Sequence, residues 1–370
     1  MIGPQDERAL AEAIRDAKDP LHVTGGGTRG ASGPGTPLST TAMTGVTLYE
    51  PGALTLIARA GTPVSEVEAV LAAENQALPF EPMDHRGILG TTGEPTIGGA
   101  VAVNASGPRR IVAGACRDCL IGVRFVDGNG TVIKNGGRVM KNVTGYDLVK
   151  LMAGSRGTLG VLSEVAFKVL PAAAASADVV LTGLSPERAV AAMAAAMRTP
   201  YGVSGAAHDP ASGETRLRLE GLENSVAYRA GRLSDALGSF GAPATHREGS
   251  RAAWAAIRDV RAFAGGSGDL WRISVAPSAA PRVVEALGQG RWTMDLAGGL
   301  IWAETDPGRD LRADLAGHRG HATLVRADAD THARLGTFHP EPAPLAAIAA
   351  DLRRRFDPRG ILNPGLMEPA

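Results

Sequence analysis

Two glycine-rich stretches determine the architecture of this chain: Leu21-His-Val-Thr-Gly-Gly-Gly-Thr-Arg-Gly30, and Pro95-Thr-Ile-Gly-Gly-Ala100, which continues to Asn104-Ala-Ser-Gly107. Successive glycines let backbone N–H groups converge on an anion, because no Cβ atom stands in the way. The two stretches lie about 70 residues apart. This arrangement indicates that two segments close on one large phosphate-bearing ligand, for which a dinucleotide has the appropriate size.

The first stretch also contains the pattern Gly25-x-Gly27-x-x-Gly30, which is typical of the Rossmann fold. In that fold a helix begins within the glycines and points its N-terminus at the pyrophosphate. Here residues 31–37 read Ala-Ser-Gly-Pro-Gly-Thr-Pro, which is incompatible with a helix. A Rossmann domain is therefore not expected, whereas a plain surface turn would leave the second stretch unexplained.

The composition indicates a globular protein without a nucleic-acid partner. The 370 residues have a formal net charge of zero and are 44% hydrophobic, which suits about two domains. Balanced charge without a basic stripe argues against nucleic acid. No apolar run approaches the roughly 20 residues that a membrane-spanning helix needs, and the polar N-terminus does not resemble a secretory signal. These features predict a cytoplasmic protein with no integral membrane segment.

The two cysteines, Cys116 and Cys119, have a spacing that also occurs in redox and metal sites. A zinc site would need two further ligands, and the eight histidines do not cluster beside this pair in the sequence. The surrounding residues read as the approach to a buried strand. We therefore expect two small buried thiols, which suit a reducing cytoplasm.

Hydrophobic periodicity predicts the secondary structure of the first part of the chain. The expected elements are a helix at 6–18, strands at 21–24 and 55–59, a helix starting at Thr62-Pro63, a hairpin turning at 127–130, a helix at 147–153 and a strand ending at Val169. The alanine run 172–175 then marks a boundary between two regions.

Beyond this boundary, strands and helices alternate as in two split βαβ units placed side by side. Strands are expected around 178–182, 202–207, 215–220, 270–275, 291–296, 300–304 and 321–326, and helices from Ser185-Pro186, around Val226, Trp254 and Val283, and at 345–356. This pattern predicts an antiparallel sheet covered by helices.

Several segments occur in an order that resembles the vanillyl-alcohol oxidase type, or PCMH-type, of FAD-binding domain. They are the two glycine-rich stretches, residues 157–164 (Gly-Thr-Leu-Gly-Val-Leu-Ser-Glu) and residues 363–365 (Asn-Pro-Gly). The resemblance implies an α+β fold with a two-lobed FAD-binding domain at 1–171. It also implies an inserted ferredoxin-like α/β cap domain at 172–320, and a C-terminal segment at 321–370 that returns to the flavin.

The same resemblance implies which residues bind FAD. They are Gly25, Gly26, Gly27, Thr28, Arg29, Gly30, Pro82, Thr96, Ile97, Gly98, Gly99, Asn104, Ser106, Gly157, Gly160, Val161 and Asn363. Some relatives attach the flavin through a histidine in the first stretch or a cysteine before the second. This chain has Gly27-Thr28 and Thr91-Thr-Gly-Glu94 at those places, so noncovalent FAD is expected.

Within this family the chain resembles the FAD-binding accessory subunits of bacterial glycolate oxidases. The resemblance implies oxidation of glycolate, a small 2-hydroxy acid, to glyoxylate together with a larger FAD subunit and an iron–sulfur subunit. Through these partners the complex would associate peripherally with the inner membrane. The alternative is a self-sufficient FAD-dependent oxidoreductase of a 2-hydroxy acid, an alditol or a lactone.

His321 is the candidate catalytic base, because it stands where related 2-hydroxy acid dehydrogenases have the first histidine of a metal motif. That motif reads Gly-His-x-Gly-Asp-Gly-Asn-x-His. Here Gly320-His321 is followed by Ala-Thr-Leu-Val-Arg, without the Gly-Asp-Gly-Asn core. No metal site is therefore expected, and Arg326 is the neighbouring cation considered for a substrate carboxylate.

Overall fold

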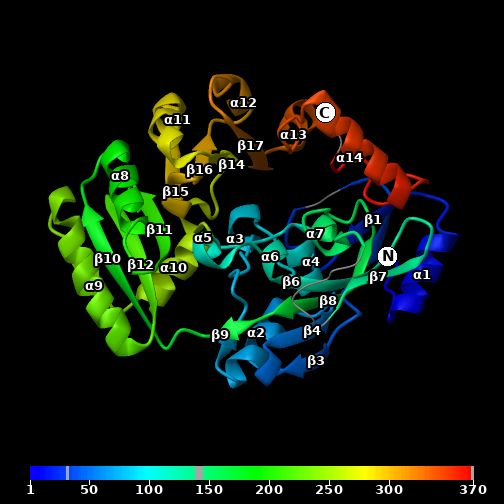
Figure 1. Cartoon of the computed structure of the whole chain (residues 1–370). Helices are drawn as coiled ribbons and strands as arrows, with labels where there is room; N and C mark the ends of the chain where they lie inside the picture. Colours follow the sequence, from blue (N-terminus) through cyan, green and yellow to red (C-terminus); the bar gives the residue numbers. More distant parts are fainter. Residues whose placement is uncertain (31–32, 138–144, 368–370) are drawn as a thin grey trace. The chain divides into compact units, whose positions relative to one another are not determined.

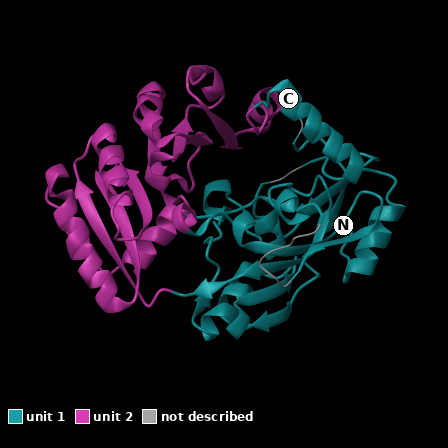
Figure 2. Cartoon of the chain, in the orientation of Figure 1, with its two compact units in different colours: residues 1–107, 113–172, 340–369 teal, residues 108–112, 173–339, 370 magenta. Residues whose placement is uncertain are grey.

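The computed structural model describes residues 1–30, 33–137 and 145–367, and it divides into two compact units (Figures 1 and 2). Unit 1 comprises residues 1–107, 113–172 and 340–369, and unit 2 comprises residues 108–112 and 173–339. Residues 321–370, expected as one returning segment, are thus divided between the two units.

Unit 1 is built around a five-stranded antiparallel sheet of order β3-β4-β8-β6-β7. Its strands are β1 (Leu21–Thr24), β2 (Thr36–Ser39), β3 (Val46–Glu50), β4 (Thr55–Arg59), β5 (Gln76–Ala77), β6 (Leu120–Val126), β7 (Val132–Gly136), β8 (Val161–Lys168) and β9 (Leu170–Pro171). Strands β1 and β2 form a separate parallel pair, and β5 pairs with β9. The predicted hairpin is the β6–β7 pair.

The helices of unit 1 are mostly short. They are α1 (Glu7–Asp16), α2 (Val64–Ala73), α3 (Arg86–Leu89), α4 (Ile97–Ala102), α6 (Cys116–Cys119), α7 (Leu148–Met152) and α14 (Ala343–Phe356), while α5 (Arg110–Ala113) lies at the division between the units. Helix α1 buries Leu10 and Ile14, as its amphipathic pattern predicts, and Asp6 caps it.

Two local predictions for unit 1 need correction. The helix expected from Thr62-Pro63 begins at Val64, and the Thr62 hydroxyl donates to the Arg59 carbonyl at 2.7 Å rather than capping it. The second glycine-rich stretch is not a loop throughout, because it contains helix α4, whose N-cap is Thr96. The Thr96 hydroxyl accepts from the Gly99 N–H at 3.2 Å, and this bond satisfies one of the free donors at the helix start.

Two other predictions are confirmed in unit 1. After the first glycine stretch the described residues 33–39 lead into strand β2 without a helix, whereas residues 31–32 lie outside the described part. Cys116 and Cys119 are free thiols that are 0% and 6% exposed. Burial raises the pKa of Cys119 to about 11, so this thiol is unreactive at neutral pH.

Unit 2 contains an eight-stranded antiparallel sheet of order β13-β10-β12-β11-β15-β16-β14-β17. Its elements are β10 (Ala175–Thr182), α8 (Pro186–Met197), β11 (Val203–Asp209), β12 (Glu214–Gly221), α9 (Glu223–Leu237), β13 (Ala244–His246), α10 (Ser250–Arg258), β14 (Asp269–Val275), α11 (Ala280–Leu287), β15 (Arg291–Asp295), β16 (Leu300–Thr305), α12 (Leu311–Asp314), β17 (Gly320–Arg326) and α13 (Ala329–Leu335). The predicted alternation of strands and helices is therefore confirmed.

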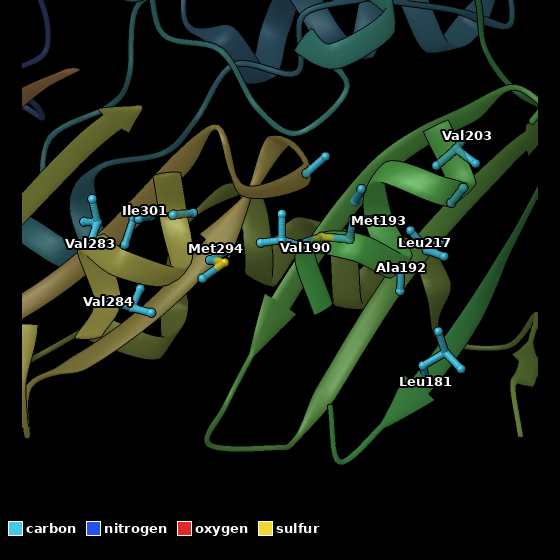
Figure 3. Packing of buried hydrophobic residues seen from close by; sticks show 14 of the residues in the cluster. Leu181, Val190, Ala192, Met193, Val203, Leu217, Val283, Val284, Met294 and Ile301 are labelled. Carbon is cyan, nitrogen blue, oxygen red and sulfur yellow. The ribbon is translucent and has the colours of Figure 1, made fainter. Parts of the chain in front are cut away.

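The hydrophobic core of unit 2 lies between one face of this sheet and helices α8, α9 and α11. Figure 3 shows Val190 and Met193 of α8 among the same buried residues as Met294 of β15 and Ile301 of β16. Because side chains alternate along a strand, the residues between these core positions face the other side of the sheet. That second face carries buried polar residues, among them Asp178 of β10 and Arg218 of β12.

Candidate functional site

A cavity in unit 1 brings together segments that are far apart in the sequence. Its volume is about 810 Å³ with its open mouth included. It is lined by Val23, Thr24, Gly25, Gly26, Gly27, Thr28, Arg29, Thr40, Ala60, Thr96, Gly98, Gly99, Ala102, Val103, Ser155, Arg156, Gly157, Gly160, Val161, Leu162, Asn363 and Leu366. Both glycine-rich stretches therefore contribute to one site, as their sequences predicted.

The glycines of the first stretch let its backbone pack directly on the second. A Cβ atom on Gly26 would lie 1.7 Å from the Glu94 carbonyl oxygen, and one on Gly25 would lie 2.3 Å from the Thr96 hydroxyl oxygen. Gly27 differs, because space beside it is open and its φ of +69° is the reason for glycine. The glycines thus serve first to join the two walls of the cavity.

Asn363 holds a third segment against these walls. Its side-chain oxygen accepts from the Val23 N–H at 2.7 Å, and its side-chain nitrogen donates to the Arg156 carbonyl at 2.8 Å. The residue is 6% exposed and has a φ of +47°, which asparagine tolerates better than most residues. One side chain therefore links β1, the 155–157 turn and the C-terminal segment.

Arg29 provides a cation in the cavity wall. Its Nε atom is buried and has no hydrogen-bond partner among the described residues, while Nη1 reaches the Thr28 hydroxyl at 3.5 Å. Burial lowers the pKa of Arg29 to about 10, an effect that Asp84 partly opposes, so the guanidinium stays charged at neutral pH. A buried charge with a free donor suits the binding of an anionic group at this place.

Ser155 is a second cavity residue with a buried polar atom that has no hydrogen-bond partner in the described part of the chain. Its hydroxyl oxygen is buried and without a partner among the described residues, and the residue lines the same cavity. Buried polar groups are nearly always hydrogen-bonded in a protein's functional state. Two orphaned polar atoms in one glycine-walled cavity fit a ligand that carries several acceptor oxygens, such as the diphosphate of FAD.

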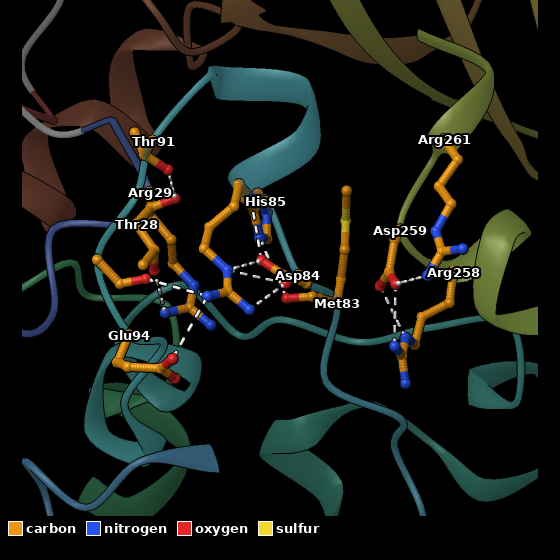
Figure 4. Close-up of polar contacts among 12 residues, drawn as sticks. Thr28, Arg29, Met83, Asp84, His85, Thr91, Glu94, Arg258, Asp259 and Arg261 are labelled. Atoms are coloured by element: carbon orange, nitrogen blue, oxygen red, sulfur yellow. Dashed lines mark hydrogen bonds and ion pairs between the residues drawn. The ribbon is translucent and has the colours of Figure 1, made fainter. Parts of the chain in front are cut away.

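The segment after Phe80 is held by an ion pair within it and by a hydrogen bond to the cavity wall (Figure 4). Arg86 Nη2 donates to Asp84 Oδ2 at 2.9 Å, and the Thr91 hydroxyl donates to the Thr28 carbonyl at 3.0 Å. Burial opposes ionisation of Asp84, but the hydrogen bonds from Arg86 outweigh it and lower the pKa of this carboxyl. Asp84 therefore stays ionised.

His85 follows in the chain and is held neutral. Burial, and then the charges of Arg29 and Arg156, lower the pKa of His85 to about 3. The ring Nδ1 lies 3.3 Å from the Met83 carbonyl. A neutral imidazole adds no further positive charge to a site that already contains two arginines.

The structure separates the expected FAD-binding residues into two groups. Those that line the cavity are Gly25, Gly26, Gly27, Thr28, Arg29, Thr96, Gly98, Gly99, Gly157, Gly160, Val161 and Asn363. Gly30, Pro82, Ile97, Asn104 and Ser106 are outside this lining set. Asn104 and Ser106 instead bind the start of α6, since they accept from the N–H groups of Arg117 and Cys116, both at 2.9 Å.

Sequence reasoning missed several lining residues, notably Thr24, Thr40, Ser155 and Arg156. Ser155 and Arg156 directly precede the recognised Gly157, so a wider window around that motif would have included them. Thr40 follows β2, and nothing in its local sequence connects it with the cavity. Its position depends on the Thr40 N–H bond to the Thr24 carbonyl, at 3.0 Å.

The candidate base His321 lies in unit 2, on β17, where its side chain is exposed. Arg326 of the same strand already has partners within unit 2. It donates to Glu304 at 2.6 Å and to the Phe263 carbonyl at 2.9 Å. Within the described ranges, histidine, cysteine and acidic side chains do not gather in threes that could hold a metal ion. The helices there are also too short or too polar to cross a membrane.

Comparisons with known proteins agree with the geometry of unit 1. The family model for the FAD binding domain matches residues 1–136, which confirms FAD as the cofactor predicted from the sequence. Solved structures of alkyldihydroxyacetonephosphate synthase superpose with a TM-score of 0.70 at 16% identity, over 98% of this chain and 76% of that one. This likeness shows a shared fold and confirms the predicted fold class.

Two curated relatives define the family more closely. The glycolate oxidase subunit GlcD of Bacillus subtilis (strain 168) is 45% identical over 76 residues, which cover 20% of this chain and 16% of that protein. The glycolate oxidase subunit GlcE of Escherichia coli (strain K12) is 35% identical over 370 residues, 97% of each chain. The chain therefore belongs to the family of the glycolate oxidase subunit GlcE, among the FAD-binding oxidoreductases.

Proposed function

We propose that this protein is the noncovalent FAD-binding subunit of a complex that oxidises glycolate to glyoxylate. The observation that carries the proposal is the cavity of unit 1, where both glycine-rich stretches surround the buried cation of Arg29. Similarity to a glycolate oxidase subunit along the whole chain supports the substrate. When bound, FAD would supply the two-electron acceptor for oxidation of the alcohol carbon.

In this proposal the cavity residues hold the cofactor mainly through fixed backbone groups. Arg29 would bind an anionic part of FAD, Ser155 would donate its hydroxyl, and Asn363 would keep the three wall segments together. No histidine or cysteine stands at the positions that relatives use for covalent attachment. The flavin is therefore expected to leave the chain on denaturation.

The partners we propose are a larger FAD subunit and an iron–sulfur subunit, and any contact with the inner membrane would go through them. The sequence lacks the Gly-Asp-Gly-Asn metal motif that would help polarise a 2-hydroxy acid. We therefore expect the chain by itself to oxidise glycolate slowly, with full activity only in the complex.

The experiment follows flavin bleaching anaerobically after glycolate is added, first to the purified chain and then to the chain with its co-expressed partners. Bleaching only with the partners is the expected result. Rapid bleaching of the chain alone, abolished in His321→Ala, would contradict the accessory role. It would favour the alternative, a self-sufficient oxidoreductase of a 2-hydroxy acid, alditol or lactone.

A further inference from the structure

A groove runs between helices α8 and α11 on the helix-covered side of the unit 2 sheet (Figure 1). Its volume is about 1140 Å³ with its open mouth included. Its apolar lining consists of Val190, Ala191 and Ala194 of α8, Pro281 of α11, and Pro277 just before that helix. These side chains are short or rigid, so the groove has room for longer apolar side chains from another molecule.

The carboxylates of this groove lie together at one end. Helices α8 and α11 each connect two parallel strands, and β11 and β15 between them are antiparallel, so the two helices run in opposite directions. Glu187 near the start of α8 and Glu285 near the end of α11 are therefore neighbours. Both are exposed, and within the described ranges neither forms an ion pair. Arg282, also in the lining, lies nearer the middle of α11.

Helix α14 of unit 1 carries a row of apolar side chains in solvent. Leu345 and Ile348 are 55% and 59% exposed, and the half-buried Leu352 follows them. Spacings of three and four residues place these side chains in one row along the helix. The helix lies wholly in the described part of the chain, and none of its residues is buried. Large apolar side chains exposed one turn apart are typical of an interaction surface.

The same row ends in positive charge. Arg355 stands three residues after Leu352, and its side chain is 73% exposed. It shares the carboxylate of Asp351 with Arg354, at distances of 2.7 Å and 3.3 Å. With Arg353, the helix has three arginines against one aspartate. Helix α14 therefore combines an apolar row with a basic end, whereas the groove combines an apolar lining with an acidic end.

We propose that α14 of one copy of this chain docks in the groove between α8 and α11 of a second copy. Ile348 and Arg355 are seven residues apart, as are Glu187 and Ala194. Seven residues of α-helix span about 11 Å. When α14 runs antiparallel to α8, Ile348 therefore meets the small Ala194, and Arg355 meets the carboxylates of Glu187 and Glu285.

The occupant is a second copy because this chain itself carries a helix that matches the groove in length, polarity and charge. The contact is heterologous, since each copy contributes α14 on one side and the groove on the other. A single helix in a groove buries less surface than a stable dimer needs, so association is weak and depends on protein concentration. The inference does not rest on the proposed function.

The first test is sedimentation velocity of the purified full chain at low salt, at about 1 to 200 µM, where weak complexes form. The average sedimentation coefficient of wild type should rise with concentration. Ile348→Glu and Ala191→Glu should each stay monomeric, because each puts a charge into an apolar contact. The control is Leu222→Glu, since Leu222 is 74% exposed but belongs to neither surface. A monomeric wild type, or variants that associate like wild type, would overturn the proposal.

A mixture of the two variants tests whether the contact is heterologous. The Ile348→Glu chain keeps its groove, and the Ala191→Glu chain keeps its α14. Together they should form a one-to-one dimer that cannot extend, although each alone is monomeric. Both substitutions are at exposed positions, and unchanged far-UV circular dichroism checks that the variants are folded. A mixture of folded variants that stays monomeric would overturn the proposal.

Charge reversal tests the direction in which α14 lies. Arg355→Glu and Glu285→Arg should each weaken association roughly threefold, and the combined variant should recover part of this loss. Equal affinity of wild type and both single variants would overturn the proposal. So would a monomeric wild type that floats with vesicles of anionic phospholipid while Ile348→Glu does not, because α14 would then bind a lipid surface.

Discussion

Arg29 is the single residue on which the electrostatics of the unit 1 cavity depend most. Replacing it with glutamine should lower FAD affinity roughly 10- to 100-fold, which is the effect of losing a charge-assisted hydrogen bond. Removal of this buried cation should not destabilise the FAD-free protein, since its Nε atom has no partner there.

The measurement is titration of FAD-free protein, followed by quenching of flavin fluorescence. Arg8→Gln is the matched control, because the Arg8 side chain is 85% exposed on helix α1. Similar FAD affinity in Arg29→Gln and Arg8→Gln would show that the cation does not bind the cofactor.

His85 should make unit 1 sensitive to acid. Its pKa falls from 6.5 to about 3 on folding, so below pH 6.5 only the unfolded chain takes up the proton. Stability from this residue is therefore present above pH 6.5 and is lost as the pH falls toward 3. Between pH 7 and pH 5 the loss should be about 2 kcal/mol.

Urea unfolding followed by far-UV circular dichroism at the two pH values gives the free energy of unfolding. His85→Gln should lack this part of the pH dependence. An equal dependence in the variant and in wild type would mean that His85 titrates normally in the folded protein.

At the scale of elements, helix α4 packs closely against the first glycine stretch. A Cβ atom on Gly99 would lie 2.9 Å from Arg29 Nη1 and 3.0 Å from the capping Thr96 hydroxyl. Gly99→Leu should therefore displace Arg29 and abolish FAD binding. Gly52→Leu is the control, because nothing lies within 4 Å of a Cβ atom at that position.

Flavin content after purification measures the effect directly. Unit 2 should stay folded in Gly99→Leu, with unchanged tryptophan fluorescence. Normal flavin content in this variant would contradict the position of α4 in the cavity wall.

Elements with strong periodicity could be predicted from the sequence, whereas helix α4 and its packing against the first glycine stretch could not. The pattern around Val226 and Val283 predicted helices α9 and α11, because an apolar face repeats over two or more turns. Helix α4 is only six residues long and contains Gly98 and Gly99, which are poor helix formers. Its capping by Thr96 and its packing against Gly25 are tertiary effects that local sequence does not reveal.

In the candidate site, too, residues within a local pattern could be predicted, and those that depend on tertiary contacts could not. Glycines, Thr96 and Asn363 could be found by their resemblance to a family pattern. Thr40, Ser155 and the unpaired Nε atom of Arg29 could not, because each depends on which distant segments meet in the folded chain. Whether a cation has a hydrogen-bond or ion-pair partner depends on the folded structure, and the order of charged residues in the sequence does not reveal it.

At the scale of the whole molecule, the two units can be observed separately. All four tryptophans, Trp254, Trp271, Trp292 and Trp302, lie in unit 2, so their fluorescence reports on that unit alone. The cavity that we propose for FAD lies in unit 1. A variant that loses flavin but keeps its tryptophan signal therefore has a defect confined to unit 1.

The central claim is that unit 1 of this chain holds one FAD noncovalently, and flavin stoichiometry tests it most directly. The chain is expressed without partners, purified, supplied with FAD and then precipitated with acid. The account predicts about one FAD per chain before precipitation, all of it released into the supernatant. Flavin that stays with the precipitated protein would contradict the noncovalent site, and a chain that binds no FAD would contradict the site itself.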